Sequence, residues 1–565
     1  MRQREIFCLG ARFRWMAVGV MGLSLSAGPA VTADDTQGYD TDSDVVEGQI
    51  APRLQTLGAH EHPITTSSPR AQLFFNQGLN LAYGFNHREA RRSFREMARL
   101  DPDAAMAYWG QALVLGPNIN APMDPEAELE ANDLVQKALS LKDGVSKKEQ
   151  ELIEALARRY SDDEEPDRTA LDEAYARAMR KVHERYPDDQ DIATLFAESL
   201  MTLSPWDYWT PAGEPYPATT EFLKVLESVM ERNLEHPGAA HLYIHAVEAV
   251  HPELAEDAAD RLVGLVPGSG HLQHMPSHIY VRVGRYEDAS HANTRAIAAD
   301  EDYITQCRAQ GIYPLLYYPH NIHFFWLASA WEGRSADAMK AAFEVGEKIG
   351  KDVDEMPEWG QVFAVVPLYA LARFGKWDEI MEQPEPPQTK TYWVGVWHYA
   401  RGLASARTKR LDQARSELEA LQKLAADETL KDVRMGANNE WILLNIASSV
   451  LAGEIALEAG EYDEAIAHLH RGVLLEDSLT YTEPPDWYFP VRQSLGAALL
   501  KAGRPLEAEV VYWDDLKHNP DNGWSLFGLM KSLEAQDKDE KAADIKKRFR
   551  SVWKRADVKL AASRF

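Results

Sequence analysis

Apolar positions recur with the spacing of an amphipathic helix along nearly the whole chain. They return every three or four residues in the segments 126–141, 147–160, 171–186 and 191–203, which indicates four helices. Pro187-Asp188-Asp189 separates the last two, as is typical of a turn between neighbouring helices. The sequence has no alternating run of Val, Ile and Thr long enough to form the strands of a sheet. The pattern therefore predicts an all-α protein.

Small and aromatic residues also recur at fixed places in a unit of about 34 residues. Counted from Ala71, positions 4, 8, 20, 24 and 32 of the first unit are Phe74, Gly78, Ala90, Phe94 and Pro102. Similar units begin near Ile446 and Phe489. This pattern resembles the tetratricopeptide repeat (TPR) family over most of residues 71–552. The resemblance implies a superhelix of helical hairpins, an α-solenoid, and says little about function.

The same pattern divides the chain into regions. We expect a signal peptide at 1–33, a flexible acidic lead-in at 34–66, an N-terminal TPR-like region at 67–235, histidine-rich TPR-like units at 236–345, irregular TPR-like units at 346–445, and C-terminal repeats with a capping helix at 446–565. Residues 204–220 hold four prolines and four aromatic residues, which predicts a long loop that either folds over the groove or connects two helices at the surface. Residues 304–318 are an insertion relative to the repeat, either a lid or a bulge.

The N-terminus has the pattern of an exported bacterial protein. Arginines precede an apolar run from Trp15 to about Ala27, and small residues around Ala33 suit cleavage after that residue. A membrane anchor needs roughly 18 or more apolar residues, and this run is shorter and broken by Gly and Ser. Later segments are less apolar, so we expect no membrane span and a periplasmic or secreted protein. Cys307 is then the one cysteine left, and an internal disulfide is excluded.

The formal net charge of −28 bears on the partners. A chain this acidic repels phosphate backbones, which leads us to expect no nucleic acid among its partners. Cations, neutral molecules and basic peptides remain as ligands. TPR grooves commonly hold peptides, so a small molecule or peptide in the concave groove and a protein partner at the C-terminal repeats are further expectations.

Nine of the 18 histidines lie between His241 and His323, and they follow the repeat. His241 and His245 are followed 33 residues later by His274 and His278. In the repeat register these positions share one face of the first helix of each unit, within an arc of roughly 80°. In TPR proteins this face lines the groove. Because packed helix axes lie about 8–10 Å apart, imidazoles from adjacent helices can reach one ion.

The helix starts favour the metal-binding form of these side chains. Pro237 and Pro319 suit first turns, whereas Pro276 either kinks its helix or delays its start. Helix N-termini and mutual crowding disfavour imidazolium, and neutral nitrogen donors suit Cu, Zn or Fe. The expected metal ligands are His241, His245, His274, His278, His320 and His323, with His271 and Glu248 as further ligands or proton-transfer groups.

Two hypotheses of function follow. In the first, a transition-metal site in the groove makes the protein a metal-dependent oxidoreductase or hydrolase. In the second, the chain is a non-enzymatic scaffold that binds peptides or partner proteins, as the TPR resemblance implies. Any single histidine is more often a hydrogen-bonded groove or core residue than a metal ligand. A metal-free acid/base enzyme would need a nucleophile, and Cys307 lies in no such motif. His236 precedes a proline and is expected to be exposed.

Overall fold

The computed structural model describes residues 48–163, 165–307, 313–349 and 358–565. The predicted signal peptide, most of the acidic residues of the lead-in and Gly311 of the insertion lie outside these residues. Over the part of the chain that is described, helices, turns and loops make up the structure without a named strand, which confirms the all-α prediction.

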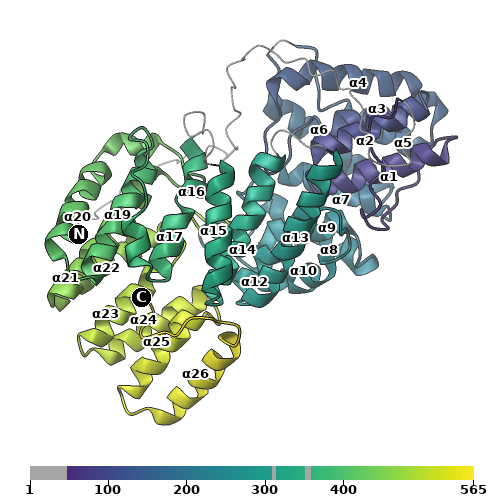
Figure 1. Ribbon diagram of the computed structural model, residues 1–565. Coiled ribbons are helices and arrows are strands. Elements are labelled where there is room, and N and C mark those ends of the chain that lie inside the picture. Colours follow the sequence, from purple (N-terminus) through teal and green to yellow (C-terminus); the bar gives the residue numbers. More distant parts are fainter. Residues whose placement is uncertain (1–47, 164, 308–312, 350–357) are drawn as a thin grey trace, which may run out of the picture.

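Hairpins of antiparallel helices follow one another along the chain (Figure 1). The N-terminal helices are α1 (Pro69–Tyr83), α2 (His87–Leu100), α3 (Ala105–Leu113), α4 (Glu128–Leu141), α5 (Lys147–Leu156), α6 (Arg168–Arg185), α7 (Gln190–Met201) and α8 (Pro217–Arg232). The central helices are α9 (Pro237–Val247), α10 (Glu256–Leu262), α11 (Gly270–His274), α12 (Pro276–Arg282), α13 (Tyr286–Cys307), α14 (Tyr318–Trp331) and α15 (Ser335–Ile349). This central group lies between the two ends of the molecule in Figure 1.

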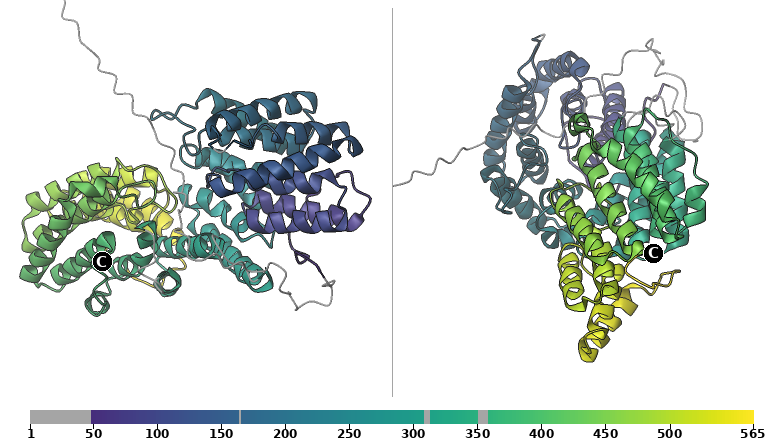
Figure 2. Two further views of the ribbon diagram at one scale, coloured as in Figure 1. Left: turned by 90° about the horizontal axis from the view of Figure 1, so that it is seen from above. Right: turned by 90° about the vertical axis from the view of Figure 1, so that its left-hand side faces the viewer.

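The C-terminal helices continue the series and curve back toward the centre (Figure 2). They are α16 (Gln361–Ala364), α17 (Val366–Arg373), α18 (Trp377–Met381), α19 (Thr391–Arg407), α20 (Leu411–Ala425), α21 (Glu440–Ala459), α22 (Tyr462–Glu476), α23 (Val491–Lys501), α24 (Pro505–His518), α25 (Gly523–Glu534) and α26 (Asp539–Val552). Trp524 of α25 donates a hydrogen bond to the carbonyl oxygen of Ala330 in α14 at 3.1 Å. The last repeats are thereby tied to the helix that carries His320.

Phe94 shows how the repeat positions predicted from the sequence build the core. Its ring is fully buried between Gly78 of α1 and Gly110 of α3, and a Cβ at either glycine would lie 2.6 or 2.5 Å from ring carbons. The two glycines let the three helices approach, and the aromatic side chain fills the space between them.

Replacing Phe94 by alanine is expected to cost about 3–5 kcal/mol of the free energy of unfolding, since it deletes a buried ring and leaves a cavity. Chemical denaturation of the single variant measures this cost. A loss below about 1 kcal/mol would contradict the packing described for this ring.

Two expectations about the chain differ from the structure. Helix α21 is long and apolar enough to cross a membrane, contrary to the sequence interpretation, but 78% of its apolar window is buried inside the fold, as in the core helix of a bundle. Residues 48–66 are packed rather than free in solvent: Ala51 and Leu57 are buried, and the amide of Ile50 donates to Glu96 of α2 at 2.8 Å.

Candidate metal centre

Three consecutive units deliver histidines to one buried region. Helix α9 begins at Pro237 and carries His241 and His245 one turn apart. The next unit is interrupted at Pro276, so that α11 carries His271 and His274 and α12 carries His278. Met275 between them keeps right-handed helical angles, so Pro276 does not delay the start of the helix and the earlier histidines are helical. His320 lies in the first turn of α14.

The first three-histidine group consists of His241, His245 and His271, which we call triad 1. One nitrogen of each ring lies within 4.8 Å of the others. Nδ1 of His241 donates to the carbonyl oxygen of Tyr83 at 2.6 Å, which leaves its Nε2 with a lone pair, 3.2 Å from Nε2 of His271. Nε2 of His245 is buried and has no hydrogen-bond partner among the described residues. Triad 1 thus brings three ring nitrogens to a shared volume, where Nε2 of His241 and Nε2 of His271 can share one hydrogen bond and Nε2 of His245 stays unpaired among the described residues.

His274, His278 and His320 form triad 2, in which the Nε2 atoms converge more closely. Nε2 of His274 lies 2.8 Å from Nε2 of His278 and 3.1 Å from Nε2 of His320. Nδ1 of His274 donates to Oδ1 of Asn293 at 2.7 Å, and the amide nitrogen of Asn293 is committed to the carbonyl oxygen of Ala289.

The Nδ1 partners decide which nitrogens of triad 2 carry hydrogen. Nδ1 of His278 faces a carboxylate oxygen of Glu248 at 2.7 Å and therefore donates, as Nδ1 of His274 does. In the neutral rings both Nε2 atoms then hold lone pairs that face each other at 2.8 Å. Such an arrangement needs a cation between or beside the nitrogens, and a proton or a metal ion can supply it.

Glu248 joins the two triads. It is fully buried, and its two carboxylate oxygens face Nδ1 of His245 at 3.2 Å and Nδ1 of His278 at 2.7 Å. Both contacts are on the ring nitrogens opposite the converging Nε2 atoms. The expected ligand or proton-transfer group therefore lies behind the rings, where a carboxylate fixes the tautomer and orientation of metal-binding histidines.

His323 is a correction to the expected ligand set. Its ring is buried against Trp326, Phe363 and Tyr488, with centroid distances of 5.2–5.4 Å, and it belongs to neither triad. A π-helical turn at Tyr313–Tyr317 precedes α14, on which His320 faces triad 2 and His323 faces Tyr488 of the C-terminal part of the chain. His271, in contrast, was expected only as an additional group and is a full member of triad 1.

Aromatic side chains enclose the imidazoles. Phe85 lies 4.6 Å from His241 and 5.6 Å from His271, and Phe324 stacks on His278 at 4.8 Å. Trp206 of the proline-rich loop contacts His245 at 5.1 Å and is 39% exposed, so this loop does cover one side of the site. Tyr317, from the described part of the insertion, covers His271 at 5.0 Å.

Further residues around the site carry no local sequence signal. Phe85 has a left-handed backbone with φ of 54°, which is uncommon for an aromatic residue and holds its ring against triad 1. Tyr83 and Asn293 bind triad rings from α1 and α13, which are distant in the sequence. Glu483 comes from the loop between α22 and α23. Burial raises its pKa to about 7, although the nearby charge of His278 acts to lower it.

Burial determines the charge state of the two triads. It lowers the pKa of His241, His245, His271, His274 and His320, and neighbouring imidazoles lower most of these values further. His278 differs: burial acts to lower its pKa, but the charge of Glu248, the hydrogen bond to Glu248 and the charge of Glu483 together raise it. Near neutral pH five of the six rings are thus in the neutral form that binds metals.

Metal-free protein is expected to lose stability in mild acid. Below pH 6.5 the unfolded chain takes up protons on the five histidines with lowered pKa while the native chain does not, so stability present above pH 6.5 falls as pH falls, by about 1.4 kcal/mol per pH unit for each ring. His278 acts in the opposite sense, because its raised pKa contributes stability that is lost as pH rises through it. Urea unfolding between pH 7.5 and 5 measures the slope, and a His241→Gln/His271→Gln variant should show a shallower one. Equal slopes would contradict the buried neutral rings.

A second histidine cluster lies around Asp191. His60 and His62 contact the two oxygens of this carboxylate at 2.8 Å each, and Tyr83 donates to it at 2.6 Å. His236, expected to be exposed, is fully buried beside it. Nδ1 of His236 accepts the amide hydrogen of Ala239 at the start of α9, and its Nε2 lies 3.3 Å from Oδ1 of Asp191. The cluster is therefore a hydrogen-bond network that fastens residues 48–66 to the fold.

Comparisons with known proteins add little to this geometry. Neither a protein-family model nor a curated relative matches the chain. Among solved structures, a human IFIT1 dimer with m7Gppp-AAAA is 12% identical, with a TM-score of 0.31, over 86% of this chain and 91% of that one. Ypp1 is 9% identical, with a TM-score of 0.38, over 85% and 88% of the two chains. TM-scores this low add no support, so the helical repeat architecture is established from the described helices alone.

The expectation that nucleic acid is excluded was wrong. The matching solved structures include human IFIT1 with the oligonucleotides m7Gppp-AAAA and PPP-AAAA. Net charge is a sum over the chain and does not describe the local surface on which a phosphate would bind. The charge of −28 therefore gives no ground for leaving nucleic acid out.

Proposed function

We propose that this is an exported metalloprotein with a binuclear transition-metal centre, in which triad 1 and triad 2 each bind one ion. The observation that carries the proposal is the convergence of the three Nε2 atoms of triad 2, at 2.8 and 3.1 Å, while the opposite nitrogens of His274 and His278 donate to fixed acceptors. This is the arrangement that histidines adopt around a metal ion.

The donor set favours borderline metals. Each triad offers three imidazole nitrogens, and the one carboxylate between them, Glu248, is occupied by Nδ1 hydrogens. Such a set suits Cu and Zn, and Fe next, rather than Mg or Ca, which prefer oxygen ligands. Three protein ligands leave a coordination position for water or substrate.

The chemistry would be that of an oxidoreductase or a hydrolase acting on a small molecule. A bound metal supplies Lewis acidity or electron transfer at the open position. Within the chain, Glu248 orients His245 and His278, and the rings of Phe85 and Phe324 exclude water from the imidazoles. Glu483, with a pKa of about 7, is suited to exchange a proton at this site near neutral pH.

The experiment compares two histidines of one helix. Untagged protein is stripped of metal, loaded with Zn²⁺ or Cu²⁺ and weighed by native mass spectrometry. Wild-type protein should bind two ions, His320→Ala should bind one, and His323→Ala, the matched control, should keep two. Retention of no ion by the wild type would sink the proposal and leave the non-enzymatic scaffold. Equal losses in the two variants would show that the triads are not the ligands.

A further inference from the structure

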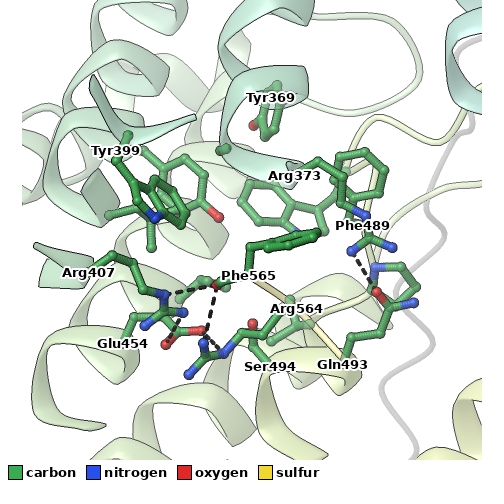
Figure 3. A pocket seen from close by; sticks show the side chains of 17 residues that line it. Tyr369, Arg373, Tyr399, Arg407, Glu454, Phe489, Gln493, Ser494, Arg564 and Phe565 are labelled. Carbon is green, nitrogen blue, oxygen red and sulfur yellow. Dashed lines mark hydrogen bonds and ion pairs between the residues drawn. The ribbon is translucent and has the colours of Figure 1, made fainter. Parts of the chain in front are cut away.

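The C-terminal repeats contain a cavity lined by arginines and aromatic rings, far along the chain from the triads. It has a volume of about 70 Å³ and lies among α17, α19, α21 and α23 (Figure 3). Its walls include Tyr369, Tyr399, Trp487 and Phe489. The chain has a net charge of −28, so its composition gives no reason to expect arginines gathered in its interior.

Two of the three arginines in this cavity have carboxylate partners. Arg407 contacts Glu454 at 2.8 Å and Glu458 at 3.0 Å, and its Nε donates to the backbone oxygen of Phe565 at 2.9 Å. Arg564 lies 2.8 Å from Glu454. These contacts, of which those to Glu454 and Phe565 are drawn in Figure 3, balance the charges on one side of the cavity.

Arg373 is the exception. It is 7% exposed, and its one hydrogen bond among the described residues is from Nη1 to the side-chain oxygen of Gln493 at 2.7 Å. The guanidinium is held flat between Trp524, at 3.5 Å from the ring centroid, and Phe489, at 4.2 Å. Stacking on two aromatic rings fixes its plane and offsets part of the cost of burial.

The unused nitrogens of Arg373 define what it lacks. Nε and Nη2 are both buried, and neither has a hydrogen-bond partner within the part of the chain that the structure describes. They occupy the same edge of the guanidinium, and that edge is the one that binds the two oxygens of a carboxylate in parallel. Burial lowers the pKa of Arg373, and the charge of Asp515 offsets only part of that effect. Arg373 is thus a buried cation with two free donors on one edge, and it lacks the two-oxygen anion that would complete an ion pair there.

We propose that this cavity is a binding site for a small carboxylate, held by Nε and Nη2 of Arg373, with an apolar or aromatic body against Tyr369, Tyr399 and Trp487. The planar two-oxygen group matches the fork of the guanidinium, and the aromatic walls select a flat or apolar remainder over a highly charged one. The cavity suits a ligand the size of acetate or, with movement of a wall, benzoate. The site is independent of the metal centre, so either proposal can fail without the other.

The test uses the full chain and named probes. Isothermal titration and thermal-shift measurements with acetate, benzoate and inorganic phosphate are made on the wild type, Arg373→Met and Arg373→Lys. We expect benzoate to bind best, phosphate worst, and both variants to bind benzoate at least tenfold more weakly, since lysine lacks the second parallel donor. Arg401→Met is the matched control, because Arg401 also stacks on a tryptophan, at 4.4 Å from Trp397, but is paired with Glu417. It should bind benzoate as the wild type does.

Three results would overturn the proposal. One is absence of binding by all three anions, which would leave Arg373 as a stacked structural cation hydrated by cavity water. Another is equal benzoate affinity in Arg373→Met and the wild type. The third is stronger binding of phosphate than of benzoate, because it would point to charge alone rather than to the two-oxygen fork. Circular dichroism of each variant confirms that the fold is kept before affinities are compared.

Discussion

Alanine at His274 is expected to remove the ion of triad 2 and most of the stability that metal adds to the protein. His274 is fully buried and is the member of triad 2 that contacts both other rings, at 2.8 and 3.1 Å. Two imidazoles then remain at this site, and two nitrogen ligands bind a transition ion far more weakly than three. We expect metal content to fall from two ions to one.

The size of the stability effect follows from mass action. A ligand present at 100 times its dissociation constant stabilises the native state by about 2.7 kcal/mol, and at 1,000 times by about 4.1 kcal/mol. The wild type should therefore melt at a clearly higher temperature with metal than without, and His274→Ala should lose that increment at triad 2. In metal-free protein the variant should differ less from the wild type, because the mutation also removes two facing lone pairs. A variant that keeps the full metal-dependent increment would refute the assignment of His274.

Glutamine at Glu248 is the second substitution with a large expected effect. The carboxylate accepts hydrogens from His245 and His278, whereas an amide has one oxygen and one hydrogen-bearing nitrogen. One of the two rings must then move its hydrogen to Nε2, where it would occupy the lone pair that a metal needs. We expect about 10–100-fold weaker metal binding, the range found when partners of metal-ligating histidines are replaced.

The same substitution should also destabilise the metal-free protein, by about 3–5 kcal/mol if Glu248 and His278 form an ion pair, because it breaks a buried pair from one side. Glu417→Gln is the control, since Glu417 accepts from His398 at 2.7 Å outside both triads. It should leave metal affinity unchanged in competition titrations with a chromogenic chelator. Equal metal affinity of Glu248→Gln and the wild type would contradict the placement of the carboxylate behind the rings.

Much of the fold could be read from the sequence because repeat positions report local packing. Phe94 needs small residues opposite it, and Gly78 stands at the expected place in the same unit. His241, His245, His274 and His278 were placed correctly on facing helices because a shift of one repeat carries one pair onto the other. The periodicity of the sequence predicts the helix face on which each histidine lies. Histidines on facing sides of adjacent helices are then expected to converge.

The rest of the site depends on contacts that periodicity does not encode. His323 shares the spacing of its neighbours, yet its ring packs against Tyr488, which lies far along the chain. Tyr83 reaches His241 from 158 positions away, and Asn293 binds His274 from the second helix of its unit. His236 looked exposed beside a proline and is buried, because it caps α9 and faces Asp191. Long-range packing decides each of these cases.

The central claim is that imidazole nitrogens of adjacent repeats converge on metal ions. Anomalous diffraction from crystals of untagged, metal-loaded protein, recorded at the absorption edge of the metal, tests it most directly. We expect two peaks, one about 2.0–2.1 Å from nitrogens of His241, His245 and His271 and the other at that distance from those of His274, His278 and His320, as for zinc bound by histidine. A map without a peak at either triad, from crystals that carry metal elsewhere, would contradict the claim.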